Sequence, residues 1–230
     1  MFPIGDERVT GGPPPIVTYG LIVLNVLAFL VELSQPSDAA LQSFIQAWGV
    51  VPREYSVARD LPPTIPLPFW STLLTSMFLH GGWMHLGGNM LYLWIFGDNL
   101  EKVMGALRFA IFYLVCGLAA SFAHIVFGHG SSVPAVGASG AISGVLGGYI
   151  LLFPHNRIRV LTRGGIAQMP AVLVLGLWIL IQFVNGIGSI AATSETAGGV
   201  AYLAHLGGFV AGLVLVKPLA SARNPALARI

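Results

Sequence analysis

The sequence GASGAISGVLGGYILLF, at residues 137–153, is an uncharged run in which glycine recurs at Gly140, Gly144 and Gly148. Small residues at this spacing let two membrane helices approach closely. From Ser139 onward the run has 15 residues, or about 22 Å of helix at 1.5 Å per residue. The hydrocarbon core of a membrane is about 30 Å thick. We therefore expect a helix that begins inside a membrane, with Ser139 at its buried amino end.

The whole chain shares this apolar character. It has 230 residues, of which 55% are hydrophobic and 9% are Asp, Glu, Lys or Arg, against about 25% charged residues in a soluble domain. A soluble globular enzyme would need a more charged surface, so most of the chain is expected to contact lipid. The net charge of +2, with no dense basic run, argues against a nucleic-acid partner.

Six apolar runs bounded by proline, glycine or charge are candidate membrane helices. They cover residues 16–33, 83–97, 109–127, 139–153, 169–190 and 198–216. We therefore expect an all-α, polytopic membrane protein with six transmembrane helices. Its core is residues 16–216, preceded by a short cytoplasmic segment, 1–15, and followed by a cytoplasmic tail, 217–230.

Positive charge orients this bundle. With both ends in the cytoplasm, nine of the eleven basic residues lie inside, and only Arg53 and Arg59 lie outside. The outer segment 34–68 is rich in proline but carries aromatic residues, so we expect it to lie on the outer membrane interface. A disordered connector is the alternative.

Polar side chains inside a membrane are costly, so each is a candidate for function. Counted at 1.5 Å per residue, His85, Ser139 and His205 all lie about 9–12 Å below the outer surface of the core. Histidine is the usual base that activates a serine nucleophile. No carboxylate is expected at this depth, so Ser139 and His205 predict a dyad. His85 and Asn89 share a helix face and, with the Ser139 N–H, predict an oxyanion hole.

Glycine supports the same arrangement. The runs 83–97 and 139–153 are short and follow glycines, so both helices are expected to start beside a water-filled pocket that opens outward. Gly208 and Gly212 repeat the four-residue spacing on the last span, which predicts close packing of the helices that carry the polar residues.

The remaining polar residues of the spans are expected to have structural roles and not catalytic ones. His124 is expected at the membrane interface, and Asn25, Gln182 and Asn185 are expected to make packing contacts.

Other chemistries fit the pattern less well. His80 and His85 are five residues apart with no acid between them, unlike the HExxH of a zinc protease. Asp98 stands alone, whereas an aspartyl protease needs two carboxylates at one depth. A transporter would place such residues at the midplane between inverted repeats, and the sequence shows no repeat.

Three motifs together resemble the rhomboid family of intramembrane serine proteases. They are GASG at 137–140, HGGWMHLGGN at 80–89 and AHLGGFVAG at 204–212. The resemblance runs in order from residue 16 to residue 216. It implies a six-helix bundle and a membrane-protein substrate, cut within or just outside its spanning helix near small and helix-breaking residues.

The resemblance also implies roles for individual residues. Ser139 is the nucleophile, forming an acyl-enzyme, and His205 is its general base. The oxyanion is bound by His85, Asn89 and the Ser139 N–H. His80 supports the pocket from nearby, and Gly137, Ala138 and Gly140 shape it around the serine. No cofactor and no metal are implied.

Two positions depart from the family pattern. Many members carry Arg after the Trp of the first outer loop, but Ser71 follows Trp70 here, which puts the anchoring of that loop in question. Many also carry an aromatic residue four positions after the serine, where this chain has Ser143. The orientation of His205 is therefore left open.

Two functions remain for the sequence. The first is an intramembrane endopeptidase acting on transmembrane proteins in the lipid bilayer. The second is a catalytically silent rhomboid-like protein that binds and escorts membrane proteins. By analogy of fold, we expect a bacterial plasma membrane location with the active site opening to the outer side. The sequence leaves the oligomeric state open.

Overall fold

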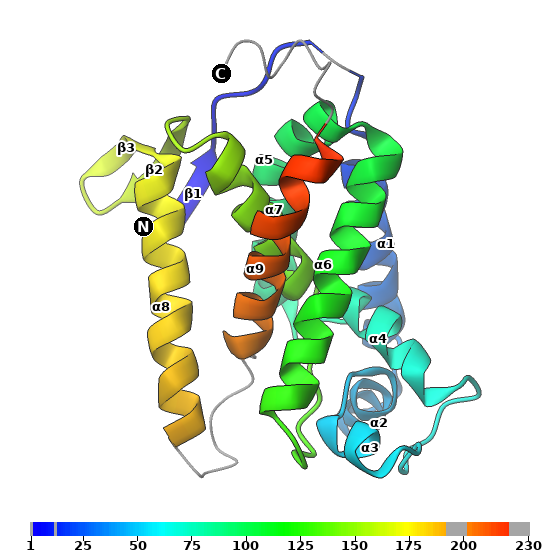
Figure 1. The fold of residues 1–230 in the computed structure, drawn as a ribbon. Coiled ribbons are helices and arrows are strands. Elements are labelled where there is room, and N and C mark those ends of the chain that lie inside the picture. Colours follow the sequence, from blue (N-terminus) through cyan, green and yellow to red (C-terminus); the bar gives the residue numbers. More distant parts are fainter. Residues whose placement is uncertain (1, 12, 192–201, 221–230) are drawn as a thin grey trace.

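Helix α7 (Ser139–Leu152) lies inside a bundle of helices in the computed structural model, which describes residues 2–11, 13–191 and 202–220 (Figure 1). Every residue of α7 from Ala141 to Tyr149 is buried. The helix packs against α5 (Trp83–Met104), α6 (Ala106–Phe127) and α9 (Tyr202–Leu219). The serine of the GASG motif is therefore the first residue of the central helix.

The other elements surround this centre. In chain order they are β1 (Phe2–Gly5), α1 (Ile16–Leu33), α2 (Asp38–Trp48), α3 (Pro52–Val57), η1 (Phe69–Ser71), α4 (Thr72–Thr75), η2 (Ser76–Phe78), β2 (Arg157–Thr162), β3 (Gly165–Pro170) and α8 (Ala171–Ala191). Within the described residues, α1, α6 and α9 are long and apolar enough to cross a membrane, whereas α7 and the stretch Ala171–Gly186 are shorter apolar helices.

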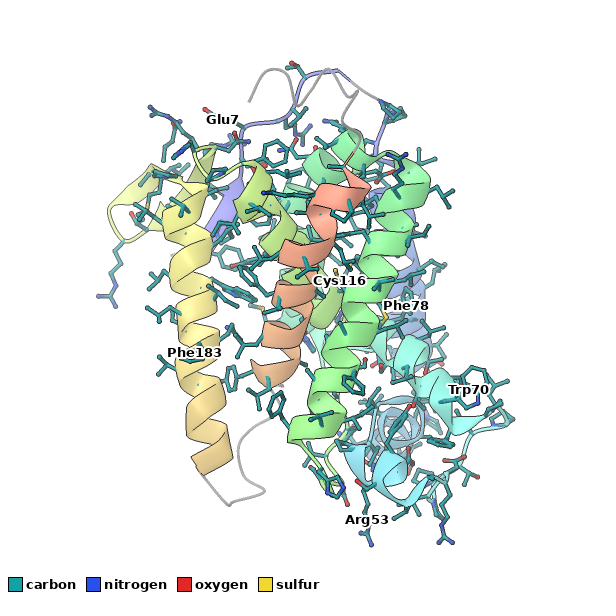
Figure 2. The ribbon with its side chains drawn as sticks, viewed as in Figure 1. Glu7, Arg53, Trp70, Phe78, Cys116 and Phe183 are labelled. Atoms are coloured by element: carbon teal, nitrogen blue, oxygen red, sulfur yellow. The ribbon has the colours of Figure 1, made fainter. Side chains whose placement is uncertain are left out.

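Glycine brings α7 and α9 together, as the four-residue spacing predicts. A Cβ added to Gly208 would overlap the carbonyl oxygen of Gly140, and one added to Gly212 would overlap that of Gly144. The two backbones are therefore in direct contact. Helix α6 takes part as well, because a Cβ on Gly144 would overlap the side chain of Cys116. Figure 2 shows Cys116 inside the bundle.

The expectation of an all-α fold is incomplete, because the strands β1, β2 and β3 form an antiparallel sheet in that order. Residues 157–162, RIRVLT, alternate between polar and apolar, and this period of two is typical of a strand. Ile158 and Val160 are fully buried, while Arg157 and Arg159, which alternate with them, are exposed. The sheet lies at the end of the bundle opposite α2 and α3 (Figure 1).

Several expected helix ends are corrected by the structure. Helix α5 starts at Trp83 as expected but runs to Met104 instead of stopping at Gly97. Its last turns contain polar residues whose partners lie on the amino-terminal segment and on α1. Glu101, for example, accepts hydrogen bonds from Val17 N and Thr18 N at 2.9 and 2.7 Å. These backbone N–H groups in the first turn of α1 have no acceptor within their own helix.

Smaller shifts affect three other helices. Helix α6 starts at Ala106, three residues early, and α8 starts at Ala171 because Met169 and Pro170 belong to β3. Helix α9 continues to Leu219. The first residues of the expected last span, 198–201, and most of the expected tail, 221–230, lie outside the described residues.

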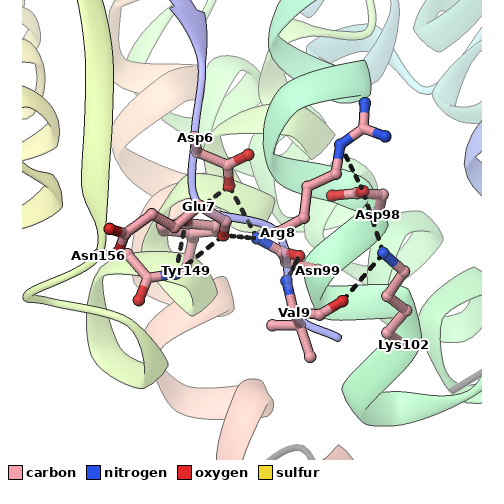
Figure 3. Close-up of polar contacts among 9 residues, drawn as sticks. All are labelled: Asp6, Glu7, Arg8, Val9, Asp98, Asn99, Lys102, Tyr149 and Asn156. Atoms are coloured by element: carbon pink, nitrogen blue, oxygen red, sulfur yellow. Dashed lines mark hydrogen bonds and ion pairs between the residues drawn. The ribbon is translucent and has the colours of Figure 1, made fainter. Parts of the chain in front are cut away.

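The amino-terminal segment is tied to the bundle by a polar network (Figure 3). The Asp6 carboxylate accepts hydrogen bonds from the Asn99 amide at 2.8 Å and the Tyr149 hydroxyl at 2.6 Å. The Asp98 carboxylate forms ion pairs with Lys102 at 3.4 Å and Arg8 at 3.9 Å. Burial, reinforced by the nearby Asp98 charge, raises the pKa of Asp6 to about 7.

The segment 34–68 contains the helices α2 and α3, so it is not a disordered connector. It forms a two-residue bridge with the loop that precedes α7, in which Val50 N donates to Ala135 O at 3.0 Å and Ala135 N donates to Val50 O at 2.9 Å. Arg53 N donates to Ser131 O at 2.9 Å. The segment therefore holds the approach to Ser139 in place. Arg53 and Glu7 lie at opposite ends of the bundle (Figure 2).

The loop that lacks an arginine after Trp70 is held by hydroxyl groups instead. Thr72 Oγ1 donates to Phe69 O at 2.6 Å and lies 2.8 Å from the Tyr55 hydroxyl. Trp70 is exposed at the edge of the molecule (Figure 2). Ser71 Oγ is buried without a hydrogen-bond partner among the described residues, so the anchoring comes from its neighbour Thr72.

Candidate active site

Gly137 sets up the start of α7. Its φ of +120° is a conformation that L side chains rarely adopt, and its N–H donates to Ser76 O at 2.8 Å. A Cβ here would lie 2.8 Å from the Nε2 atom of His85 and 3.5 Å from the amide nitrogen of Asn89. Only glycine therefore lets the chain turn into α7 this close to two polar side chains of α5.

Ser139 and His205 meet across the contact between α7 and α9. Ser139 Oγ lies 2.8 Å from His205 Nε2, a hydrogen-bond distance. His205 is only 8% exposed. The two residues are 66 positions apart in the sequence, so the glycine-mediated approach of the two helices is what brings them together.

His85 and Asn89 face the same point from α5. Gly81 N donates to His85 Nδ1 at 3.3 Å. In a neutral imidazole the proton is then on Nε2, the atom close to Gly137. Asn89 is 8% exposed, and its amide nitrogen has no hydrogen-bond partner among the described residues. Both side chains thus offer an N–H donor close to Gly137, two residues before Ser139.

A cavity of about 520 Å³ connects these residues, within the range typical of small-molecule and substrate sites. Its wall includes Ser139, His205, His85, Asn89, Trp178 and Gln182. His124 is also part of this wall, so it contributes to the pocket rather than only to a membrane interface. Within the residues that the structure describes, His, Cys, Asp and Glu do not gather in a group able to hold a metal ion.

His80 lies behind the pocket. It is 1% exposed, its ring packs edge-on against His85 with 5.1 Å between centroids, and its ring Nδ1 lies 3.2 Å from Phe78 O. Its backbone N–H donates to both carboxylate oxygens of Glu32, at 2.9 and 3.1 Å. Glu32 is itself 1% exposed and fixes the segment that leads to α5.

The sequence reasoning missed the residues that surround the far side of His205. Gln182 Oε1 lies 2.7 Å from His205 Nδ1, and the Trp178 ring lies 5.9 Å from the imidazole, tilted by 38°. The sequence predicts only packing contacts for Gln182, so this hydrogen-bond distance corrects that prediction. Trp178 and Gln182 are four residues apart on α8 and thus share one helix face, which is the signal that would have linked them.

Ser143 lies four residues after Ser139, at the position where the resemblance predicts an aromatic residue. Its hydroxyl donates to the Ser139 carbonyl at 2.6 Å, back along its own helix. The aromatic neighbour of His205 therefore comes from α8 instead of α7.

The fold and the site together define a class of protein, a helical membrane protein with a serine–histidine pair in a cavity of the helical bundle. The family model described as the Rhomboid domain matches residues 68–222. The chain belongs to the rhomboid family, a family that includes serine proteases, and is an integral membrane protein.

Several curated relatives are similar over much of this chain. Rhomboid protease GluP of Bacillus subtilis is 32% identical over 209 residues, covering 90% of this chain and 36% of the relative. Rhomboid protein 1, mitochondrial, of Saccharomyces cerevisiae is 28% identical, covering 87% and 52%. Rhomboid-type serine protease 2 of Emericella nidulans is 30% identical, covering 64% and 26%. The chain thus spans between about a quarter and a half of the length of these relatives.

Proposed function

We propose that this chain is an intramembrane serine endopeptidase that cleaves transmembrane segments of membrane proteins. The observation that carries the proposal is the 2.8 Å separation of Ser139 Oγ and His205 Nε2 inside a cavity of the helical bundle. The names of the relatives, which include a rhomboid protease and a rhomboid-type serine protease, support the same reaction.

In the proposed mechanism, His205 Nε2 takes the proton of Ser139 Oγ as this oxygen attacks the peptide carbonyl of the substrate. The carbonyl oxygen becomes an oxyanion, which accepts hydrogen bonds from the His85 and Asn89 side chains and the Ser139 N–H. His205 then gives its proton to the leaving amine. Water, activated by the same imidazole, hydrolyses the acyl-enzyme and restores Ser139.

The oxyanion donors carry much of the expected rate. One such donor contributes about 2.7–4 kcal/mol to lowering the barrier in a serine protease. The amide nitrogen of Asn89 is buried and has no partner among the described residues, so it is available to a developing negative charge. The amino end of α7 adds the positive end of its helix dipole.

The proposal includes the arrangement in the membrane. The six spans are α1, α5, α6, α7, α8 and α9, forming a core at 16–216 with cytoplasmic segments at 1–15 and 217–230. In this arrangement the end of the bundle that carries α2 and α3 faces the outer side of a bacterial plasma membrane, and the cavity is proposed to open there. Glu7, in the proposed cytoplasmic segment, and Arg53, in the proposed outer segment, lie at opposite ends of the bundle (Figure 2), as this arrangement requires.

The test is cleavage of a reporter in liposomes. Purified protein is reconstituted with a single-span protein whose membrane segment contains small and helix-breaking residues, and the fragments are identified by mass spectrometry. Wild type is expected to cut, and Ser139→Ala is expected to be inactive. Ser143→Ala removes a neighbouring hydroxyl from the same helix and is expected to remain active.

The outcomes separate the two candidate functions. Cleavage by a folded Ser139→Ala protein would overturn the mechanism. A folded wild type that binds the reporter but leaves it intact would favour the silent, escorting protein.

A further inference from the structure

The polar partner of His205 is an amide buried on an apolar helix. Gln182 is 9% exposed, whereas its neighbours Ile181 and Phe183 are 48% and 50% exposed. Its Oε1 atom lies 2.7 Å from His205 Nδ1, on the side of the ring opposite to Ser139. A polar side chain turned inward between two outward-facing apolar ones contacts the imidazole directly.

We infer that Gln182 is the positioning residue of His205, whose carbonyl oxygen accepts the Nδ1 proton and so leaves Nε2 free to take the proton of Ser139. This inference rests on the proposed roles of Ser139 and His205. It assigns to an amide the orienting task that a carboxylate performs in a serine–histidine–aspartate triad.

The chemistry of the two side chains decides which ring nitrogen of His205 carries the proton. A neutral imidazole carries one proton, either on Nδ1 or on Nε2. An amide oxygen can only accept, so a contact of 2.7 Å between Oε1 and Nδ1 requires the proton on Nδ1. The other tautomer would leave a buried oxygen unpaired and would present an N–H to Ser139, which could then no longer lose its proton to His205.

An amide suits this place better than an acid. An isolated carboxylate is costly to bury in an apolar environment, whereas a hydrogen-bonded amide carries no charge. An amide can also rotate and present its nitrogen, so its orientation has to be held. Trp178 lies one helical turn before Gln182, on the same face of α8. The centroid of its ring is 5.9 Å from that of the His205 imidazole, so it supplies the aromatic neighbour that Ser143 cannot.

The experiment compares three variants by the rate at which a fluorophosphonate probe labels the purified, folded protein. Gln182→Met keeps the length of the side chain but removes the oxygen. Gln182→Glu keeps an oxygen at the same reach. Asn185→Met removes an exposed amide from the same helix and is the matched control.

A second readout is nitrogen-15 NMR of the histidine rings, in which protonated and unprotonated ring nitrogens have separate chemical shifts. The His205 signals are assigned by their loss in His205→Gln. A purely structural role for Gln182 would not alter which ring nitrogen carries the proton.

The inference predicts three results. Gln182→Met labels at least about 10- to 100-fold more slowly than wild type, the range found when the partner that orients a metal-binding histidine is removed. Gln182→Glu keeps an oxygen acceptor but places a costly carboxyl group in an apolar environment, so it loses less of the rate than Gln182→Met. Asn185→Met is unchanged. In wild type the His205 proton is on Nδ1, and in Gln182→Met the two tautomers mix.

Other results would overturn it. Equal labelling of Gln182→Met and wild type, or an equal loss in Gln182→Met and Gln182→Glu, would show that the oxygen acceptor is not what matters. A wild-type His205 protonated on Nε2 would also refute it, even if the variants failed to fold. By contrast, labelling that persists in Ser139→Ala would refute the proposed function itself.

Discussion

Gly212→Ala is expected to damage both the stability and the site of this protein, because it inserts a methyl group between the two helices that carry Ser139 and His205. The new Cβ would overlap the Gly144 carbonyl oxygen and lie 2.7 Å from the carbonyl carbon. Ordinary carbon contacts are about 3.5–4.0 Å. The atoms in the way belong to the backbone, so relief requires α9 to move away from α7 by about 1 Å.

The size of the effect follows from two opposing terms. Overpacking costs about 1–3 kcal/mol, and replacing glycine by alanine inside a helix returns about 0.5–1 kcal/mol. The net destabilisation is about 0–2.5 kcal/mol, which lowers the unfolding midpoint by up to about 10 °C for a chain of this size. A shift of about 1 Å also lengthens the Ser139–His205 contact, with a loss of activity of about 100-fold.

The assay is thermal unfolding in detergent, together with fluorophosphonate labelling at a temperature where all variants are folded. Gly20→Ala on α1 and Gly176→Ala on α8 are the controls, because nothing lies within 4 Å of an added Cβ at either position. They are expected to match or slightly exceed the stability of wild type. Gly212→Ala melting together with these controls would refute the packing argument.

Three further predictions concern other polar groups. Asn89→Ala is expected to slow turnover by about 100- to 1,000-fold with little change in melting, since its amide nitrogen bonds to no described residue; unchanged kinetics would reduce Asn89 to a packing role. Glu101→Ala is expected to cost at least about 1.5–3 kcal/mol in thermal unfolding, because the N–H groups of Val17 and Thr18 lose their acceptor; Glu101→Gln, which keeps one oxygen, should lose less, and equal melting of all three proteins would contradict the account. The pKa of Asp6 is raised from 3.8 to about 7 on folding, so the stability it contributes is complete below about pH 4 and is lost as the pH rises through about 7. Unfolding midpoints should therefore fall over this range in wild type and fall less in Asp6→Asn, and identical pH profiles would argue against a raised pKa.

Local signals in the sequence predicted the parts of the fold that depend on one segment at a time. Helix α1 has the predicted bounds, and α5 and α7 begin where predicted, at Trp83 and Ser139. In each of the latter two cases a glycine with positive φ, Gly82 or Gly137, lies just before the helix. Glycine before an apolar run is visible without any knowledge of the partners.

Features that depend on distant segments were not predicted. Strand β1 pairs with β2 through Phe2 and Leu161. Neither segment contains a sequence pattern that identifies the other as its partner. The extension of α5 past Gly97 is another example. From the sequence alone, the charged residues Asp98 and Glu101 indicate the end of a membrane helix, because their partners on the amino-terminal segment and α1 are not visible there.

The site was predicted in the same uneven way. Depth along each helix was enough to bring Ser139 and His205 together, because both lie on helices with a clear end. The contact of Gln182 with His205 was not predicted, because α8 is apolar almost all round and its sequence does not reveal which face turns inward. The aromatic residue four positions before Gln182, Trp178, is the one hint that this face has a partner.

The central claim is that Ser139 is activated by His205 inside the membrane domain, and covalent labelling tests it most directly. Purified wild type, Ser139→Ala and His205→Ala are incubated with a fluorophosphonate probe, after thermal unfolding has shown that all three are folded. The account predicts that wild type is labelled at Ser139 and that labelling is lost in both variants. Labelling that persists in either variant, or a folded wild type that stays unlabelled, would contradict it.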